Sequence, residues 1–153
     1  AYADCGTGGR LDAVLERWRA ERIPGAHCYE FYATADVFHA LADAEPGTFY
    51  LTDFLVRHFD RLVIEDLKLN IHPTLRDTLF AHYTRVVYLA QTEDASLVAG
   101  AERAADQLAL PLEVIQTGLG NLQSAVTAQV LRWQDRSEAP GEPTTSRVAH
   151  AAH

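Results

Sequence analysis

Methionine is absent from the 153 residues of this chain, and cysteine occurs only at positions 5 and 28. Two cysteines are too few for the disulfide scaffold of a small secreted domain, so we expect Cys5 and Cys28 to be thiols that can bind a metal or react. Because the chain begins Ala1-Tyr2-Ala3, without an initiator methionine, we expect it to be processed, trimmed or the C-terminal part of a longer protein.

Long apolar runs and an excess of positive charge are also lacking. No stretch approaches the ~18 consecutive apolar residues of a membrane span, and no signal peptide opens the chain. The 21 acidic residues outnumber the 13 Lys and Arg residues, and the resulting net charge of −8 would repel a phosphate backbone. We therefore expect a cytoplasmic protein that binds neither nucleic acid nor membranes.

Composition and patterning favour one α/β domain. Hydrophobic residues make up 48% of the chain, enough to fill a core at this length. Short apolar runs alternate with segments of helical spacing, which predicts a three-layer, Rossmann-like fold: a mostly parallel sheet with helices on both faces. We expect a single domain over residues 1–135 that lacks its N-terminal unit, and a disordered tail over 136–153, where Pro, Gly, Ser and Thr are frequent.

Turn residues and apolar periodicity place the individual elements. The expected strands are 1–4, 22–30, 48–52, 85–90 and 112–116. The expected helices are 11–18, 37–44, 53–62, 74–80, 94–108 and 122–133. Asp53 stands where a side chain can cap the helix that follows strand 48–52.

Polar residues follow every expected strand, and ligands bind outside the carboxyl ends of the strands in an open parallel sheet. The residues at these ends are Asp4-Cys5, His27-Cys28, Thr52-Asp53, Gln91-Thr92 and Thr117-Gly118. Both cysteines of the chain fall in this set, which is the main indication of a site. Among the histidines only His27 belongs to it, and the others, including His58, are expected to be solvated or capping.

Cys5, His27 and Cys28 are the candidate metal ligands. Thiolate and imidazole together suit zinc, iron or copper. Glu30 and Asp53 are candidate acceptors that orient a ligand or contact a cofactor. Two other interpretations stay open: Cys28 as a small buried residue beside a hydrogen-bonded His27, or Cys5 and His27 as a nucleophile and its base.

A glycine-rich turn lies between the first expected strand and helix. Gly6, Gly8 and Gly9 let the backbone approach an anionic ligand or cofactor at a helix N-terminus, or serve only the tight packing of strand and helix. The turn also resembles the first motif of S-adenosylmethionine-dependent methyltransferases, in which Glu30 would hold the ribose. S-adenosylmethionine is therefore an alternative cofactor.

Four blocks, in order, resemble an uncharacterised family of bacteria and archaea, domain of unknown function sixteen thirty-eight. They are YADCGTGG (2–9), RIPGAHCYE (22–30), EPGTFYLTDF (45–54) and VVYLAQT (86–92). The resemblance runs from about Ala1 to Gly120. It implies that this chain is the C-terminal portion of a longer domain whose N-terminal unit carries another cysteine. It also implies an association with corrinoid-dependent methyl transfer.

We therefore expect a protein that binds a metal, such as zinc or iron, or a metallocofactor, in or beside corrinoid-dependent methyl transfer or one-carbon metabolism. The alternatives are an S-adenosylmethionine-dependent methyltransferase and a non-enzymatic protein-interaction module. The expected partners are a small-molecule or cofactor ligand and corrinoid methyl-transfer proteins. An exposed edge strand would also permit pairing with a second copy. No residue is assigned a catalytic role, and whether the protein is an enzyme stays open.

Overall fold

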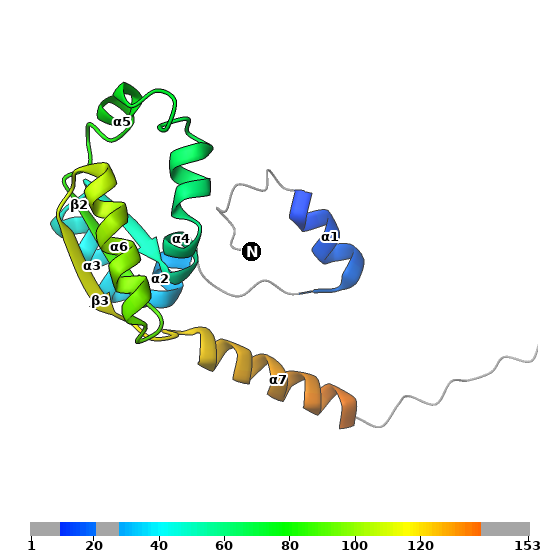
Figure 1. Ribbon diagram of the computed structural model, residues 1–153. Helices are drawn as coiled ribbons and strands as arrows, with labels where there is room; N and C mark the ends of the chain where they lie inside the picture. Colours follow the sequence, from blue (N-terminus) through cyan, green and yellow to red (C-terminus); the bar gives the residue numbers. More distant parts are fainter. Residues whose placement is uncertain (1–9, 21–27, 139–153) are drawn as a thin grey trace, which may run out of the picture.

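The computed structural model describes residues 10–20 and 28–138, with side chains as far as residue 134. The elements are α1 (Arg10–Trp18), α2 (Cys28–Ala33), α3 (Ala35–Ala44), β1 (Thr48–Thr52), α4 (Asp53–Arg57), the π-helix η1 (Asp60–Glu65), α5 (Thr74–Leu79), β2 (Arg85–Ala90), α6 (Ala95–Leu108), β3 (Leu112–Gln116) and α7 (Leu122–Glu138). Figure 1 shows their arrangement. The strand expected at 1–4 and most of the one expected at 22–30 lie outside the described residues.

The three strands form a parallel sheet in the order β1-β2-β3. Thr48 pairs with Arg85 at the start of β1, and Val86 pairs with Leu112 at the start of β3. The central strand is buried on both sides, since Val86 to Ala90 have no exposed surface. Such a continuous apolar run is typical of a parallel strand that helices cover on both faces.

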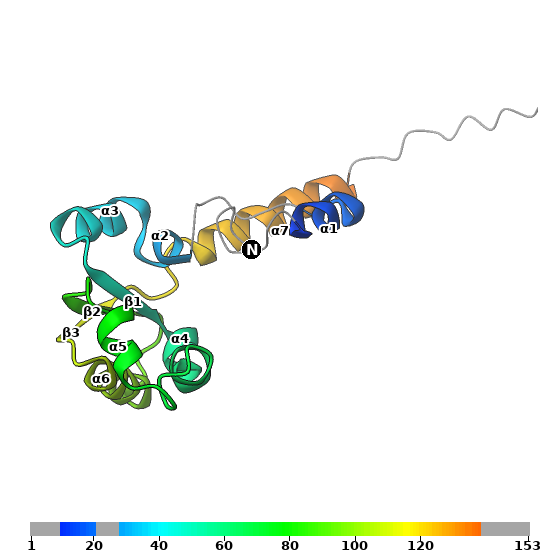
Figure 2. The ribbon, with the colours of Figure 1, turned by 90° about the horizontal axis from the view of Figure 1, so that it is seen from above.

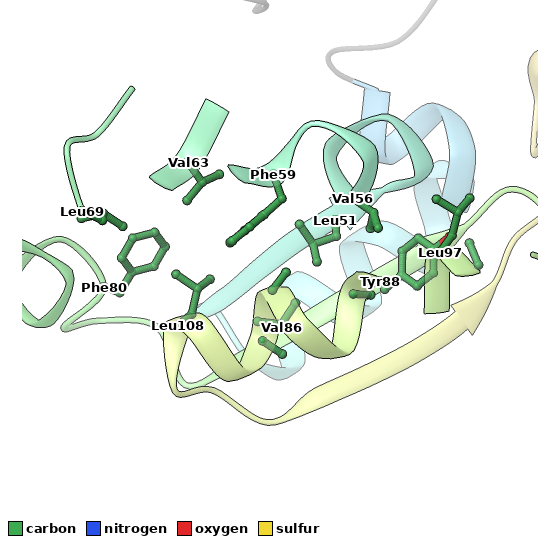
Figure 3. Close-up of a cluster of buried hydrophobic side chains, with 14 residues drawn as sticks. Leu51, Val56, Phe59, Val63, Leu69, Phe80, Val86, Tyr88, Leu97 and Leu108 are labelled. Atoms are coloured by element: carbon green, nitrogen blue, oxygen red, sulfur yellow. The ribbon is translucent and has the colours of Figure 1, made fainter. Parts of the chain in front are cut away.

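The larger core lies on the face of the sheet that α4, η1 and α6 cover. Side chains alternate along a strand, so Leu51, Val86 and Tyr88 point to this face. They meet apolar residues of the three helices, among them Val56, Val63 and a row on α6. Figure 3 shows this cluster.

The opposite face is covered by α2 and α3, as Figure 2 shows. Val87 and Leu89 of β2 pack here against Ala33, with Tyr29 and Phe38 around them. Helices thus lie on both faces of a parallel sheet, which confirms the predicted three-layer α/β fold. The core on this side is smaller, and in the described part of the chain two short helices cover it.

The helix α2 corrects the prediction that a strand continues through Glu30. Residues 28–33 are helical, and Tyr29 and Ala33, four residues apart, both pack against the sheet. That spacing is one helical turn, so burial of the pair favours a helix over a strand. Cys28 is therefore the first residue of a helix instead of the end of a strand.

The last helix, α7, leads away from the three layers (Figure 1). It carries exposed apolar residues, among them Val126 and Val130. The helix continues to Glu138, past the expected domain boundary at 135, and residues 139–153 lie outside the described residues.

Candidate functional site

A cavity of about 370 Å³ opens where β1 and β2 end. Its wall consists of Tyr32, Asp53, Phe54, Arg57, His58, Gln91 and Leu119. These residues come from four separate segments: α2, α4 with the residue that follows it, the loop after β2 and the loop after β3. The carboxyl ends of parallel strands point the same way, so the fold itself brings these segments together.

Asp53 joins the ends of β1 and β2. Its carboxylate accepts three hydrogen bonds: from the Tyr88 hydroxyl (2.7 Å), the Gln91 backbone N–H (2.9 Å) and the Thr92 hydroxyl (2.7 Å). The side chain is 9% exposed. A buried carboxylate with three donors is held in one orientation, so it fixes the geometry of this corner of the cavity.

The helix cap differs from the one predicted at Asp53. Thr52 is the N-cap of α4, and its hydroxyl accepts a hydrogen bond from the Leu55 backbone N–H at 3.3 Å. Both residues are good N-caps, and the donors on β2 draw the Asp53 carboxylate away from the helix. Asp53 is therefore a cross-strand acceptor.

Tyr88 is the buried partner of Asp53. Burial raises the pKa of its hydroxyl, and the hydrogen bond to Asp53 and the negative charge of Asp53 raise it further. The hydroxyl therefore stays protonated and donates to the carboxylate at neutral pH.

Gln91 is fixed in the wall by both ends of its amide. The amide oxygen accepts from the Asp53 backbone N–H at 2.7 Å, and the amide nitrogen donates to the Leu89 carbonyl. With these contacts made, Gln91 shapes the cavity.

The helix α2 brings Tyr32 to the cavity, with Cys28 one turn earlier on the same face. Burial raises the pKa of Tyr32, and the negative charges of Cys28 and Asp53 add to the rise. Cys28 therefore belongs to the helix that reaches the cavity, one turn before Tyr32.

Gly120 sets the position of α2. The Asn121 backbone N–H donates to the Phe31 carbonyl at 3.1 Å, and a Cβ on Gly120 would lie 2.1 Å from the Tyr32 carbonyl oxygen. The residue also has φ +50, which favours glycine. The loop after β3 therefore holds the end of α2, and with it Tyr32.

Arg57 and His58 close α4 at the cavity wall. His58 follows the last helical residue, and its ring lies 4.7 Å from that of Phe54, one turn earlier. The π-helix η1 begins two residues later, at Asp60. π-turns within helices often occur at functional sites.

The predicted site residues divide into three groups. Asp53 lines the cavity, whereas Cys28 and Glu30 are on α2 but are not part of the wall. The others, Cys5, Gly6, Gly8, Gly9 and His27, lie outside the described residues. Residues 10–20 and 28–138 contain no group of three metal-binding side chains.

Sequence reasoning named Asp53 and Gln91 as strand-end residues and missed the rest of the wall. His58, for which a solvated or capping role was expected, is the C-cap residue of α4 and is half-buried at the cavity. Arg57 and His58 follow Asp53 by one helical turn, so the helix after a strand end was the available signal.

Among the described residues, no helix has the length and apolarity that a membrane span requires.

Comparison with known proteins identifies a family. Neither curated proteins nor solved structures give a match. Residues 1–126 match the model of the proteins of unknown function called DUF1638, the domain of unknown function sixteen thirty-eight. The chain belongs to the DUF1638 family.

Proposed function

We propose that this protein binds a small polar molecule, a substrate or a cofactor, in the cavity at the carboxyl ends of β1 and β2. The observation that carries the proposal is the convergence of four segments on one cavity around the buried Asp53 carboxylate. Open α/β sheets bind their ligands at this edge.

Asp53, Tyr88 and Gln91 prepare the cavity instead of reacting in it. Their hydrogen bonds join β1 to β2 before any ligand arrives, so binding does not have to order these side chains. Tyr32, Arg57 and His58 remain to contact the ligand. The proposal therefore concerns binding and assigns no catalytic residue.

A cavity-filling variant tests this proposal. Leu119 is 47% exposed in the wall, and Leu119→Trp should fill the cavity without disturbing the core. Val130→Trp is the control, because Val130 is also 47% exposed but lies on α7. We expect a compound found by thermal-shift screening of charged and neutral metabolites, S-adenosylmethionine included, to bind wild type and Val130→Trp but not Leu119→Trp. Equal binding to both variants would contradict the proposal.

A second candidate is the metal or metallocofactor, and the position of Cys28 favours it. Cys28 lies one helical turn before Tyr32, which lines the cavity. Cys28 would be one ligand, with Cys5 and His27, which lie outside the described residues, as the others. The oxygens of Asp53 already accept three hydrogen bonds, so Asp53 suits an orienting role better than coordination.

A bound metal would supply Lewis-acid chemistry or a cofactor attachment point, and a role in or beside corrinoid-dependent methyl transfer belongs to this candidate. A cytoplasmic location, which we also propose, keeps such thiols reduced. Metal analysis of the protein purified without oxygen should give a stoichiometric metal that Cys28→Ser and His27→Gln remove. His39→Gln, on the exposed side of α3, should retain it. A metal-free wild type would contradict this candidate.

A further inference from the structure

The acceptors in the cavity wall are already engaged with the protein. Both oxygens of Asp53 accept hydrogen bonds, and three donors share them. The amide oxygen of Gln91 accepts from the backbone of Asp53. A ligand that brings mainly donors would therefore find these acceptors occupied.

The hydrogen-bond donors in the wall, by contrast, are available to a ligand. Within the described part of the chain, the Arg57 guanidinium forms no ion pair. Its charge nevertheless acts at this edge, where the pKa of Asp94 is lowered by hydrogen bonds from Ser96 and, to a smaller degree, by Arg57. The guanidinium is thus an exposed cation at the cavity that Asp53 does not neutralise.

Tyr32 and His58 are two further hydrogen-bond donors in the same wall as Arg57. Tyr32 keeps its proton at neutral pH, because burial and the charges of Cys28 and Asp53 raise its pKa. His58, the next residue after Arg57, can donate a hydrogen bond from its imidazole ring. The cavity therefore offers donors and positive charge, although the chain as a whole carries −8.

Apolar groups complete the wall. Phe54 is 59% exposed and Leu119 is 47% exposed, so both present apolar surface at the cavity. Their rings and methyl groups suit an apolar or planar portion of a ligand. The cavity thus combines a donor-rich corner with an apolar surface.

We propose that the ligand is a small organic anion, a carboxylate or a phosphate ester on an apolar or planar group, whose oxygens bind Arg57 and His58. This inference rests on the proposed function, and it names the class of molecule that the cavity takes. Arg57 is suited to this role, because its planar guanidinium can donate two parallel hydrogen bonds to either anion.

Titration of the full chain with small probes tests the inference. The probes are phenyl phosphate, benzoate, inorganic phosphate and neutral benzyl alcohol, followed by the backbone NMR signals of Arg57, His58 and Gln91. We expect saturable shifts with phenyl phosphate or benzoate, and the tighter of the two identifies the anion. Inorganic phosphate, which lacks the ring, should bind more weakly.

Two arginine variants provide the decisive comparison. Arg57→Ala should weaken the better anion at least about tenfold, because a charge-assisted hydrogen bond is lost. Arg61→Ala removes the same charge from an exposed position outside the cavity and should bind like wild type. Equal affinity in the two variants would overturn the inference.

The outcomes separate this inference from the proposed function. Benzyl alcohol binding as tightly as the anions, with shifts at the same residues, would overturn anion recognition and leave the binding cavity in place. Shifts from none of these probes would overturn the inference, and the Leu119→Trp screen then decides the proposed function independently.

Discussion

The amino and carboxyl ends of the three strands each have an arginine beside them, and the two arginines differ in the contacts they make with the protein. At the amino end, the Arg85 side chain donates to the Thr48 hydroxyl (2.9 Å), the Leu41 carbonyl (3.1 Å) and the Glu113 carboxylate (2.9 Å). At the carboxyl end, Arg57 has no ion-pair partner among the described residues. One arginine joins α3 and all three strands, whereas the other stands at a cavity.

The rest of each end follows the same contrast. At the amino end, a Cβ on Gly47 would lie 2.6 Å from the His82 carbonyl oxygen, so there is no spare room. At the carboxyl end, a cavity of about 370 Å³ remains open around Asp53. The amino end is therefore built for stability, and the carboxyl end is where we propose that the ligand binds. Asp53 contributes to both ends' roles, because it joins β1 to β2 and lines the cavity.

The largest effect on stability is expected at Asp53. Asp53→Ala leaves three donors without their acceptor, one of them the fully buried Tyr88 hydroxyl, and should lower the free energy of unfolding by about 3 kcal/mol. Urea denaturation measures the loss. The control is Asp77→Ala, since Asp77 pairs only with the neighbouring Arg76 at the surface and should change stability little. A loss below about 1 kcal/mol would show that Asp53 does not hold the strands together.

The second-largest effect on stability is expected at the amino end of the strands. Arg85→Ala removes the donors of a partly buried network and should lower the free energy of unfolding by about 2 kcal/mol. Arg76→Ala, which removes the same charge from an exposed pair, is the matched control and should stay within about 0.5 kcal/mol of wild type. If the two variants unfold at the same urea concentration, the amino end is not the stabilising one.

Tyr88→Phe isolates one contact of Asp53 and should cost about 1 kcal/mol at neutral pH. The pKa of Tyr88 is raised in the folded state above its ordinary value of 10.0, so its contribution is complete below that pH and is lost as the pH rises further. Wild type should therefore lose stability above pH 10 more steeply than Tyr88→Phe. An equal loss of stability above pH 10 in wild type and Tyr88→Phe would contradict this role of Tyr88.

The strands could be predicted from the sequence because local signals agree with the tertiary structure. The runs at 48–52, 85–90 and 112–116 are apolar and bounded by turn residues, and the structure has strands at these positions. The helix α6 begins one residue later than predicted, because Asp94 is its N-cap. The strand expected through Glu30 is a helix, since only the packing of Tyr29 and Ala33 on β2 decides that segment.

The site could be predicted only in part, because its contacts join residues distant in the chain. Asp53 was found from its place after a strand, but the choice between capping α4 and bridging to β2 depends on Tyr88 and Gln91. Tyr32 reaches the cavity because Gly120 admits the end of α2. No local pattern reveals such a contact, and an arginine on a helix after a strand resembles any solvated residue.

The smallest effect on stability should come from Arg57→Ala, and it completes the comparison. Arg57 is exposed and forms no ion pair with another described residue, so its folded-state contribution is limited to weak interactions with the C-terminal end of α4 and with Asp94. The free energy of unfolding should stay within about 0.5 kcal/mol of wild type. The measurement is urea denaturation beside Arg85→Ala. A loss as large as that of Arg85→Ala would mean that Arg57 is structural, and the open end of the sheet would then be a second stabilising end. If Arg57 binds the ligand, Arg57→Ala should leave the free energy of unfolding nearly unchanged and should weaken anion binding. A ligand-binding side chain contributes to the complex and adds little to the stability of the protein without its ligand.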